Sequence, residues 1–360
     1  MDYTRQTRFS DPGRHLPRLA ALAGPAALPA ASSGADLPSV AASSGAAAFS
    51  GAAASSRATG SSGVAALSGA GALSGVVAGV GAAVRNLVVH YRASGLDFPP
   101  ARLAEIDSRW VEALLDTLPL DQPLDEPRPA DQRIVGCCRD FTLLTVAALR
   151  SRGIPARSRV GFADYFDPDF HVDHVITEFH DGDRWIATDT QLAPDDGFPV
   201  DVTDVPLGPG GLRPAAQCWL AFRRGEIDPD TYGVGPGVPL HGPLMIRKYV
   251  LTELAHRFGD ETLLWDFWGP DAAWLGDLGG RPLVEAWPGL PSWDSGDVTL
   301  IDEIAELLVA ADAGDSSAED RAAKLYAVDP RVHVGDTVTC HSPRGLAYDV
   351  DLRRPSPAIP

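Results

Sequence analysis

Positive charge is scarce in this sequence. Its 360 residues contain 30 Lys and Arg against 48 Asp and Glu, which leaves a formal net charge of -18. Binding to a nucleic-acid backbone depends on clustered Lys and Arg, and anionic lipid surfaces attract the same residues. The charge balance therefore argues against nucleic acid and against a membrane surface as the main partner.

Cysteine is also rare, with four residues: Cys137, Cys138, Cys218 and Cys340. So few cysteines in a chain of this length do not indicate a disulfide framework. A bridge between the adjacent Cys137 and Cys138 would be strained, because neighbouring backbone geometry suits it poorly. We expect free thiols and a cytoplasmic protein, since thiols stay reduced in that compartment.

Charged and large apolar side chains are few in residues 20–84, which are mostly Ala, Gly and Ser. Such a segment cannot bury enough apolar surface to offset its ordering entropy, so we predict a flexible insert after an N-terminal segment, 1–19. Two alternatives remain open. Residues 19–31 share features with the apolar part of a secretory signal. The uncharged run 58–84 is long enough to span a bilayer.

The rest of the chain is typical of a folded protein. Residues 84–91 and 101–118 have helical patterns, and residues 136–152 are apolar on nearly every face. A helix that is apolar all round is a central one, and Gly153 with Pro155 marks its end. Three strand candidates follow, at residues 156–163, 172–180 and 184–190.

Cys138 falls at or near the first turn of the buried helix. Backbone N–H groups are unpaired there and the helix dipole is positive, so both a thiolate and a developing oxyanion are stabilised. Gly136 allows the chain to turn sharply into the helix. Cys138 is therefore a candidate nucleophile, although an isolated buried thiol is more often structural. Its neighbour Cys137 is more typical of a packing residue.

The last two strand candidates are joined by His180-Asp-Gly-Asp183, and Asp-Gly is a strong signal for a tight hairpin. If His180 pairs with Asp183, counting back along both strands places His174 directly opposite Asp189. Opposed side chains are within reach of an imidazole–carboxylate hydrogen bond. The hairpin thus predicts a His174–Asp189 pair, which together with Cys138 would form a nucleophile–base–carboxylate triad.

The residues around these positions resemble the core of the transglutaminase-like superfamily. Residues 136–141 read GCCRDF and residues 152–157 read RGIPAR, and they are followed by HVITE from His174 and WIATD ending at Asp189. On this resemblance the family's Cys, His and Asp fall on Cys138, His174 and Asp189. Ile176 and Thr190 stand where the family commonly has Trp and Pro, which bears on the shape of the substrate groove.

The resemblance implies an α+β, papain-like and transglutaminase-like fold, with the helix that carries the cysteine packed on an antiparallel sheet. It implies no metal and no organic cofactor. The expected reaction is acyl transfer or hydrolysis at an amide bond of a peptide or protein, through a thioester. A catalytic domain would cover residues 85–275, with residues 276–360 packed on it as a C-terminal extension. A cysteine peptidase acting on an extended peptide, and an inactive binding module of the same fold, remain alternatives.

Gln132 is a candidate oxyanion donor, because papain-type proteases have a glutamine six residues before the nucleophile. Glu178 lies on the same strand face as His174 and is predicted to anchor Arg157. The Trp-rich segment 262–274 could line a pocket or fill the core.

A zinc site is not expected. His171, His174 and His180 with the two adjacent cysteines fit no common spacing of zinc ligands, and His171 and His174 would lie on opposite faces of a strand.

Overall fold

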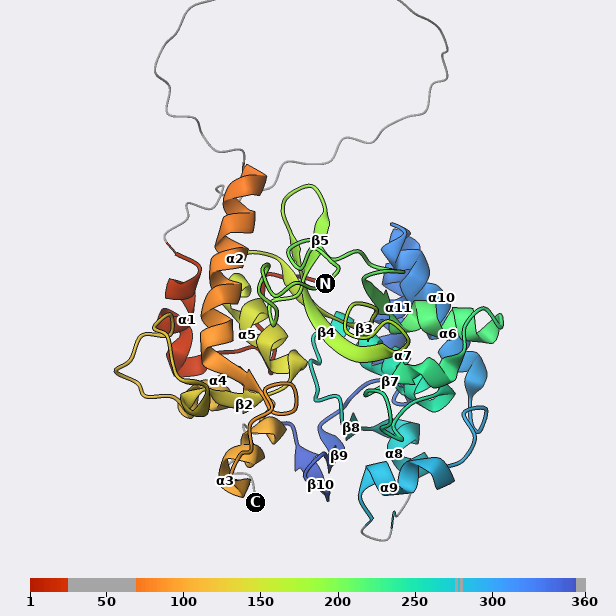
Figure 1. The fold of residues 1–360 in the computed structure, drawn as a ribbon. Helices are drawn as coiled ribbons and strands as arrows, with labels where there is room; N and C mark the ends of the chain where they lie inside the picture. Colours follow the sequence, from red (N-terminus) through yellow and green to blue (C-terminus); the bar gives the residue numbers. More distant parts are fainter. Residues whose placement is uncertain (25–68, 276–277, 279–280, 354–360) are drawn as a thin grey trace, which may run out of the picture.

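The structure is a computed structural model that describes residues 1–24, 69–275, 278 and 281–353 (Figure 1). Its helices are α1 (Leu16–Leu22), α2 (Gly69–Leu87), α3 (Pro100–Leu103), α4 (Val111–Asp116), α5 (Cys138–Arg150), α6 (Ala215–Arg223), α7 (Pro243–Arg257), α8 (Gly269–Leu275), α9 (Leu283–Ala286), α10 (Val298–Asp312) and α11 (Ser316–Val328). Its strands are β1 (Val88–His90), β2 (Ile134–Gly136), β3 (Ala156–Ala163), β4 (His171–His180), β5 (Trp185–Thr188), β6 (Leu212–Pro214), β7 (Tyr232–Gly233), β8 (Asp266–Phe267), β9 (Thr337–Ser342) and β10 (Leu346–Asp351).

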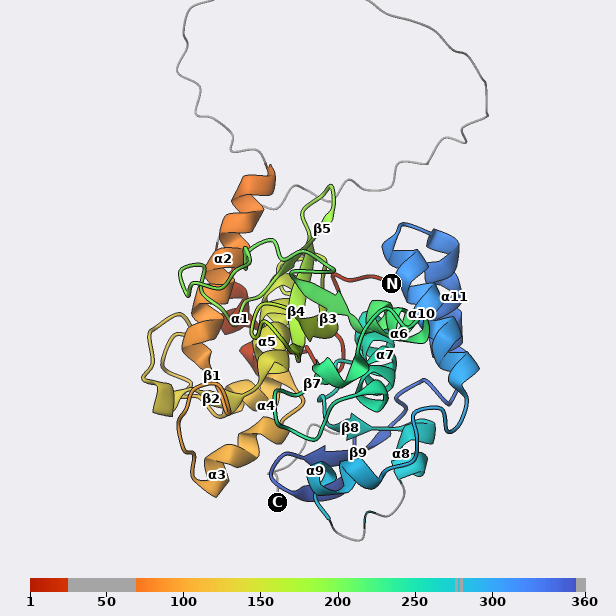
Figure 2. The ribbon, with the colours of Figure 1, turned by 45° about the vertical axis from the view of Figure 1, so that its right-hand side comes forward.

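The central sheet has the strand order β5-β4-β3-β6 and is antiparallel, with β7 added in parallel to β4. Helix α5 packs against β4 and β3, and α7 packs against β3. Figures 1 and 2 show these two helices on either side of the β3–β4 pair. Every residue of α5 is buried, so the predicted central helix is confirmed, as is an α+β core in which this helix packs on an antiparallel sheet.

The ends of the predicted elements follow local chemistry. Gly153 has φ 71°, the left-handed conformation that favours glycine after a helix, and β3 covers the predicted residues 156–163. Arg157 Nε donates to Glu178 Oε2 at 2.7 Å across the β3–β4 pair, which confirms the predicted anchor.

The register predicted for the β4–β5 hairpin is wrong by two residues. His180 pairs with Trp185, and not with Asp183. The Asp181 side chain accepts hydrogen bonds from the backbone N–H groups of Asp183 and Arg184, at 2.8 and 2.9 Å. This side chain-to-backbone turn enlarges the loop to four residues, an option that the Asp-Gly pair alone does not reveal.

Helix α2 occupies part of the range predicted to be flexible. It begins at Gly69, and its buried residues Val77, Val80 and Val84 face the protein core where α2 packs against α5. Residues 25–68, the larger part of the predicted insert, lie outside the described residues. No helix in the described ranges is long and apolar enough to cross a membrane.

Two helical predictions need correction. Residues 84–91 contain the end of α2 and then strand β1, because β1 pairs in parallel with β2. Residues 101–118 are interrupted between α3 and α4. There the buried Arg109 donates from Nε to Asp266 Oδ2 at 2.9 Å, and Asp107 accepts from Trp265 Nε1 at 2.9 Å. These ion-pair and hydrogen-bond contacts to distant segments override the local helical pattern.

Residues 281–353 pack against the rest of the fold through strand pairing and helix contacts. Strand β9 pairs with β8 and β10, which fixes the C-terminal strands to the segment that follows α7. Helix α10 packs against α6, α7 and α11. The end of the chain therefore contributes to the same body as the α5–sheet core, as Figure 2 shows from the side.

Candidate active site

The start of α5 is built by its own sequence motif. Cys137 is the N-cap residue: its side chain accepts the backbone N–H of Asp140, and Asp140 Oδ2 accepts the Cys137 N–H at 2.8 Å. This reciprocal pair is a capping box, and it leaves Cys138 as the first helical residue. A Cβ on Gly136 would lie 2.7 Å from Asp140 Oδ2, so glycine is needed here for close approach and not for a left-handed turn.

Arg139, the next residue of the motif, has a structural role. Its side chain is buried, forms an ion pair with Asp140 at 3.0 Å, and donates to the carbonyl oxygen of Arg109 at 2.6 Å. The motif therefore fixes the direction of α5 through a cap, an ion pair and a link to the interrupted 101–118 segment.

His174 and Asp189 meet although their strands are not in the predicted register. His174 Nε2 lies 2.7 Å from Asp189 Oδ2. A shift of two residues keeps every side chain on its predicted face, and diagonal neighbours of this kind are still within reach of each other. Tyr165 also donates its hydroxyl to Asp189 Oδ2 at 2.9 Å, and Gln191 N–H donates to Oδ1 at 3.1 Å.

The segment that carries Asp189 is held by two helices. The hydroxyls of Thr145 in α5 and Thr190 are hydrogen-bonded to each other at 3.0 Å. Arg85 of α2 donates to the carbonyl oxygens of Thr190 and Leu192 at 3.2 and 3.0 Å. Thr190, which departs from the family's common Pro, thus supplies a hydroxyl that ties Asp189 to the cysteine helix.

Hydrogen bonding and charge favour an ionised pair at the centre of the site. Hydrogen bonds from Cys137 and His174, with the positive charge of His174, hold the pKa of the Cys138 thiol well below its usual range against the effect of burial. Burial opposes the charge on His174, but Asp189 and Cys138 together raise its pKa to about 10. Since Nε2 of His174 is bonded to Asp189, Nδ1 is the ring nitrogen left for the sulfur.

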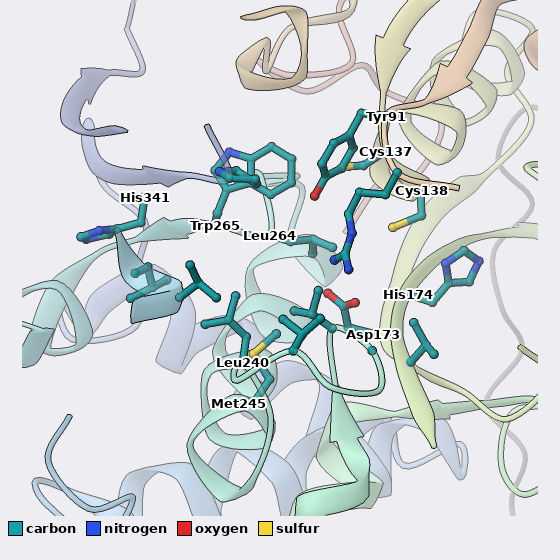
Figure 3. Close-up of a pocket in the computed structure, with 18 of the residues that line it drawn as sticks. Tyr91, Cys137, Cys138, Asp173, His174, Leu240, Met245, Leu264, Trp265 and His341 are labelled. Atoms are coloured by element: carbon teal, nitrogen blue, oxygen red, sulfur yellow. The ribbon is translucent and has the colours of Figure 1, made fainter. Parts of the chain in front are cut away.

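Cys138 and His174 open into a pocket of about 650 Å³. Figure 3 shows them side by side on one side of this pocket, with Leu264 and Trp265 across from them. Trp265 thus lines the pocket, whereas Trp268 lies in the core with Nε1 bonded to the Val332 carbonyl oxygen at 2.9 Å, so the Trp-rich segment serves both predicted purposes.

Gln132 is not brought to this pocket. It is exposed, ends a short 3-10 helix, and does not line the cavity. His90, which the sequence did not single out, does line it, because parallel pairing of β1 with β2 places His90 beside Gly136. The sequence has no pattern that predicts this position, because a three-residue strand directly after a helix is too short to show periodicity.

Tyr165 is the other residue missed. It follows β3 in a segment without a recognisable motif, and only the fold brings its hydroxyl to Asp189. Over the residues described here, no three His, Cys, Asp or Glu side chains are grouped in a way that could hold a metal ion.

Comparison with known proteins found similarity to a protein family and to a solved structure. Residues 119–190 match the family model of the transglutaminase-like superfamily. A solved structure of a candidate cysteine protease from Cytophaga hutchinsonii is 20% identical over 35% of this chain and 40% of that one, with a TM-score of 0.16. No curated protein matches the chain. The family match shows that residues 119–190 of this chain form part of a transglutaminase-like domain.

Proposed function

We propose that this protein is a cysteine enzyme that transfers or hydrolyses an acyl group at an amide bond, with Cys138, His174 and Asp189 as its triad. One observation carries the proposal: Cys138, at the start of α5, lines the same pocket as His174, whose Nε2 lies 2.7 Å from Asp189 Oδ2. An inactive binding module would have no need of this arrangement.

The chemistry follows from the roles of these groups. The Cys138 thiolate attacks the amide carbonyl carbon, and the His174 imidazolium then gives its proton to the leaving amine as the C–N bond breaks. Water or a second amine attacks the thioester carbon, gives a proton to His174 and releases the thiolate. Asp189 keeps the imidazole in the tautomer with its proton on Nε2 whenever the ring is neutral, so that Nδ1 faces the sulfur.

Alkylation of Cys138 by iodoacetamide should already be fast near pH 6. The thiolate is lost only as pH falls through the lowered pKa of Cys138, and the imidazolium is lost only as pH rises through about 10. The ion pair is therefore favoured between the lowered pKa of the Cys138 thiol and about pH 10. Tandem mass spectrometry of the modified peptide measures the rate at each pH and separates Cys138 from Cys137.

His174→Ala should reduce the alkylation rate near pH 6 by at least about tenfold, because it removes a hydrogen bond and a positive charge from the sulfur. If the wild-type protein reacts no faster than a free thiol and His174→Ala changes nothing, the enzyme proposal is wrong. Incorporation of a fluorescent primary amine into a peptide, compared with cleavage of the same peptide, then distinguishes acyl transfer from proteolysis.

We further propose His90 as an oxyanion donor in the position that Gln132 does not reach. His90 Nδ1 accepts the backbone N–H groups of Arg92 and Ala93, both at 3.1 Å, so a neutral ring carries its proton on Nε2. Burial lowers the pKa of His90 to about 4, which keeps the ring neutral at physiological pH. Nε2–H and the Cys138 backbone N–H would then bind the oxyanion together.

His90→Ala should lower kcat by about 10²- to 10³-fold, which is typical for the loss of one oxyanion donor. Alkylation by iodoacetamide forms no oxyanion, so its rate should change little in the same variant. His90→Gln retains an N–H donor and should recover part of kcat. Equal losses in kcat and alkylation would show instead that His90 acts on the thiol or on the fold.

A further inference from the structure

The pocket beside Cys138 extends well beyond the reacting groups. Its volume of about 650 Å³ lies within the range of sites that hold a whole small molecule. Most of its wall away from Cys138 is apolar and comes from the loop before α7, from α7 itself and from the segments that follow. The main apolar residues are Leu240, Met245, Leu264, Trp265, Phe267 and Trp287.

Several polar atoms of this wall are already bonded to the protein, whereas His341 Nδ1 is buried without a hydrogen-bond partner among the described residues. Lys248 donates from Nζ to the Leu264 carbonyl oxygen and to Thr252 Oγ1, and it lies over two aromatic rings. The Trp265 indole N–H donates to Asp107 at 2.9 Å, and that of Trp287 to a backbone carbonyl at 3.1 Å. Apart from His341, the wall therefore presents mainly aromatic rings and aliphatic side chains to a ligand.

Asp173 supplies negative charge on the nucleophile's side of the pocket. It precedes His174 in β4, lines the pocket (Figure 3) and accepts a hydrogen bond from the hydroxyl of Tyr249. Burial and the negative charge of Cys138 raise its pKa to about 6, so the carboxylate is mostly ionised at neutral pH. Arg92 and Lys248 line the same pocket, so the main obstacle to an acidic side chain is the loss of its hydration against a mostly apolar wall.

We propose that the acyl donor is a peptide whose residue at the reacting carbonyl carries a bulky apolar side chain, aromatic or branched aliphatic, which fills this pocket. The inference rests on the proposed function and deepens it. The wall residues lie outside residues 119–190, so selectivity is set by parts of the chain beyond the family's core. Glutamine and glutamate side chains would leave the apolar wall uncovered.

Chloromethyl ketones of N-acetylated phenylalanine, leucine, alanine and glutamate test this directly. Each forms a thioether with Cys138 as chloride leaves, and the second-order inactivation rate is divided by the iodoacetamide rate of the same protein. We expect phenylalanine and leucine to exceed alanine by about 10- to 100-fold, and glutamate to be slowest. Equal ratios for phenylalanine and alanine would overturn the pocket proposal.

Two variants test whether the preference for bulky apolar side chains arises in this pocket. Leu240→Asp should lower the phenylalanine ratio by about tenfold, and Val284→Asp, at a pocket residue that is 39% exposed, provides a second test if Leu240→Asp does not fold. Leu346→Asp is the matched control, since Leu346 is 42% exposed and does not line the pocket. A ratio unchanged in both pocket variants would refute the assignment. Slow iodoacetamide labelling in the wild type would instead refute the proposed function.

Discussion

Replacing Cys138 by alanine should abolish amide-bond turnover, with a fall in kcat of about 10⁴- to 10⁶-fold. The sulfur is the only protein atom in the proposed sequence of steps that forms a covalent bond to the acyl group, so no other side chain replaces it. Hydrolysis of the p-nitroanilide of N-acetyl-phenylalanine measures the rate. Intact-mass spectrometry in addition shows whether an acyl-enzyme accumulates in the wild type and is absent from the variant.

Two other cysteine variants make this test specific. Cys218→Ala removes a buried thiol from α6 that does not line the pocket, and turnover should persist. Cys137→Ser retains an N-cap oxygen and a hydroxyl donor beside the nucleophile, so its loss should be much smaller than that of Cys138→Ala. Normal turnover in Cys138→Ala, with loss in Cys137→Ser, would move the nucleophile to Cys137.

Asp189→Asn should lower kcat by about 10³- to 10⁴-fold, because the amide holds the imidazole in the wrong tautomer and no longer stabilises the imidazolium. Asp189 is a principal reason that the pKa of His174 is raised to about 10. In the variant that pKa should fall toward the ordinary histidine range. The alkaline limit of the imidazolium–thiolate pair, followed by the NMR signal of His174, should therefore move to lower pH.

Tyr165→Phe tests whether the charge of Asp189 or the hydrogen bond that orients its carboxylate matters more. It removes a hydrogen bond to Asp189 Oδ2 but leaves the carboxylate and its bond to His174. We expect kcat to fall by about tenfold or less and the pKa of His174 to remain raised. A loss as large as that of Asp189→Asn would mean that the network around Tyr165, and not the carboxylate charge, holds the site together.

The hairpin shows how sequence reasoning can be right for a partly wrong reason. The prediction that His174 and Asp189 pair depended on a register that is two residues off. The two side chains still meet because side chains on a strand alternate between faces, so a register shift of two residues leaves each on the same face. The loop length depended on how the Asp181 side chain bonds to the backbone, which the dipeptide signal does not specify.

The site beyond the triad could not be anticipated in the same way. Gln132 was chosen by its offset from the cysteine, but it lies exposed on a 3-10 helix. His90 stands 48 positions before Cys138 and reaches the pocket through the pairing of β1 with β2. Local periodicity contains no information about which distant strand a short segment will join.

The sequence by itself determined the features that depend on neighbouring residues. These are the buried cysteine helix with its capping motif, the glycine that lets the chain approach Asp140 closely, and the strand faces of His174 and Asp189. Only the tertiary structure decided the hairpin register, the break at Arg109, and the pocket with His90 and the C-terminal segments in its wall. The physical reason is the separation along the chain over which each interaction acts. Helix caps and the alternation of strand faces depend on residues a few positions apart, whereas the ion pairs and the pocket wall join segments that are far apart in the chain.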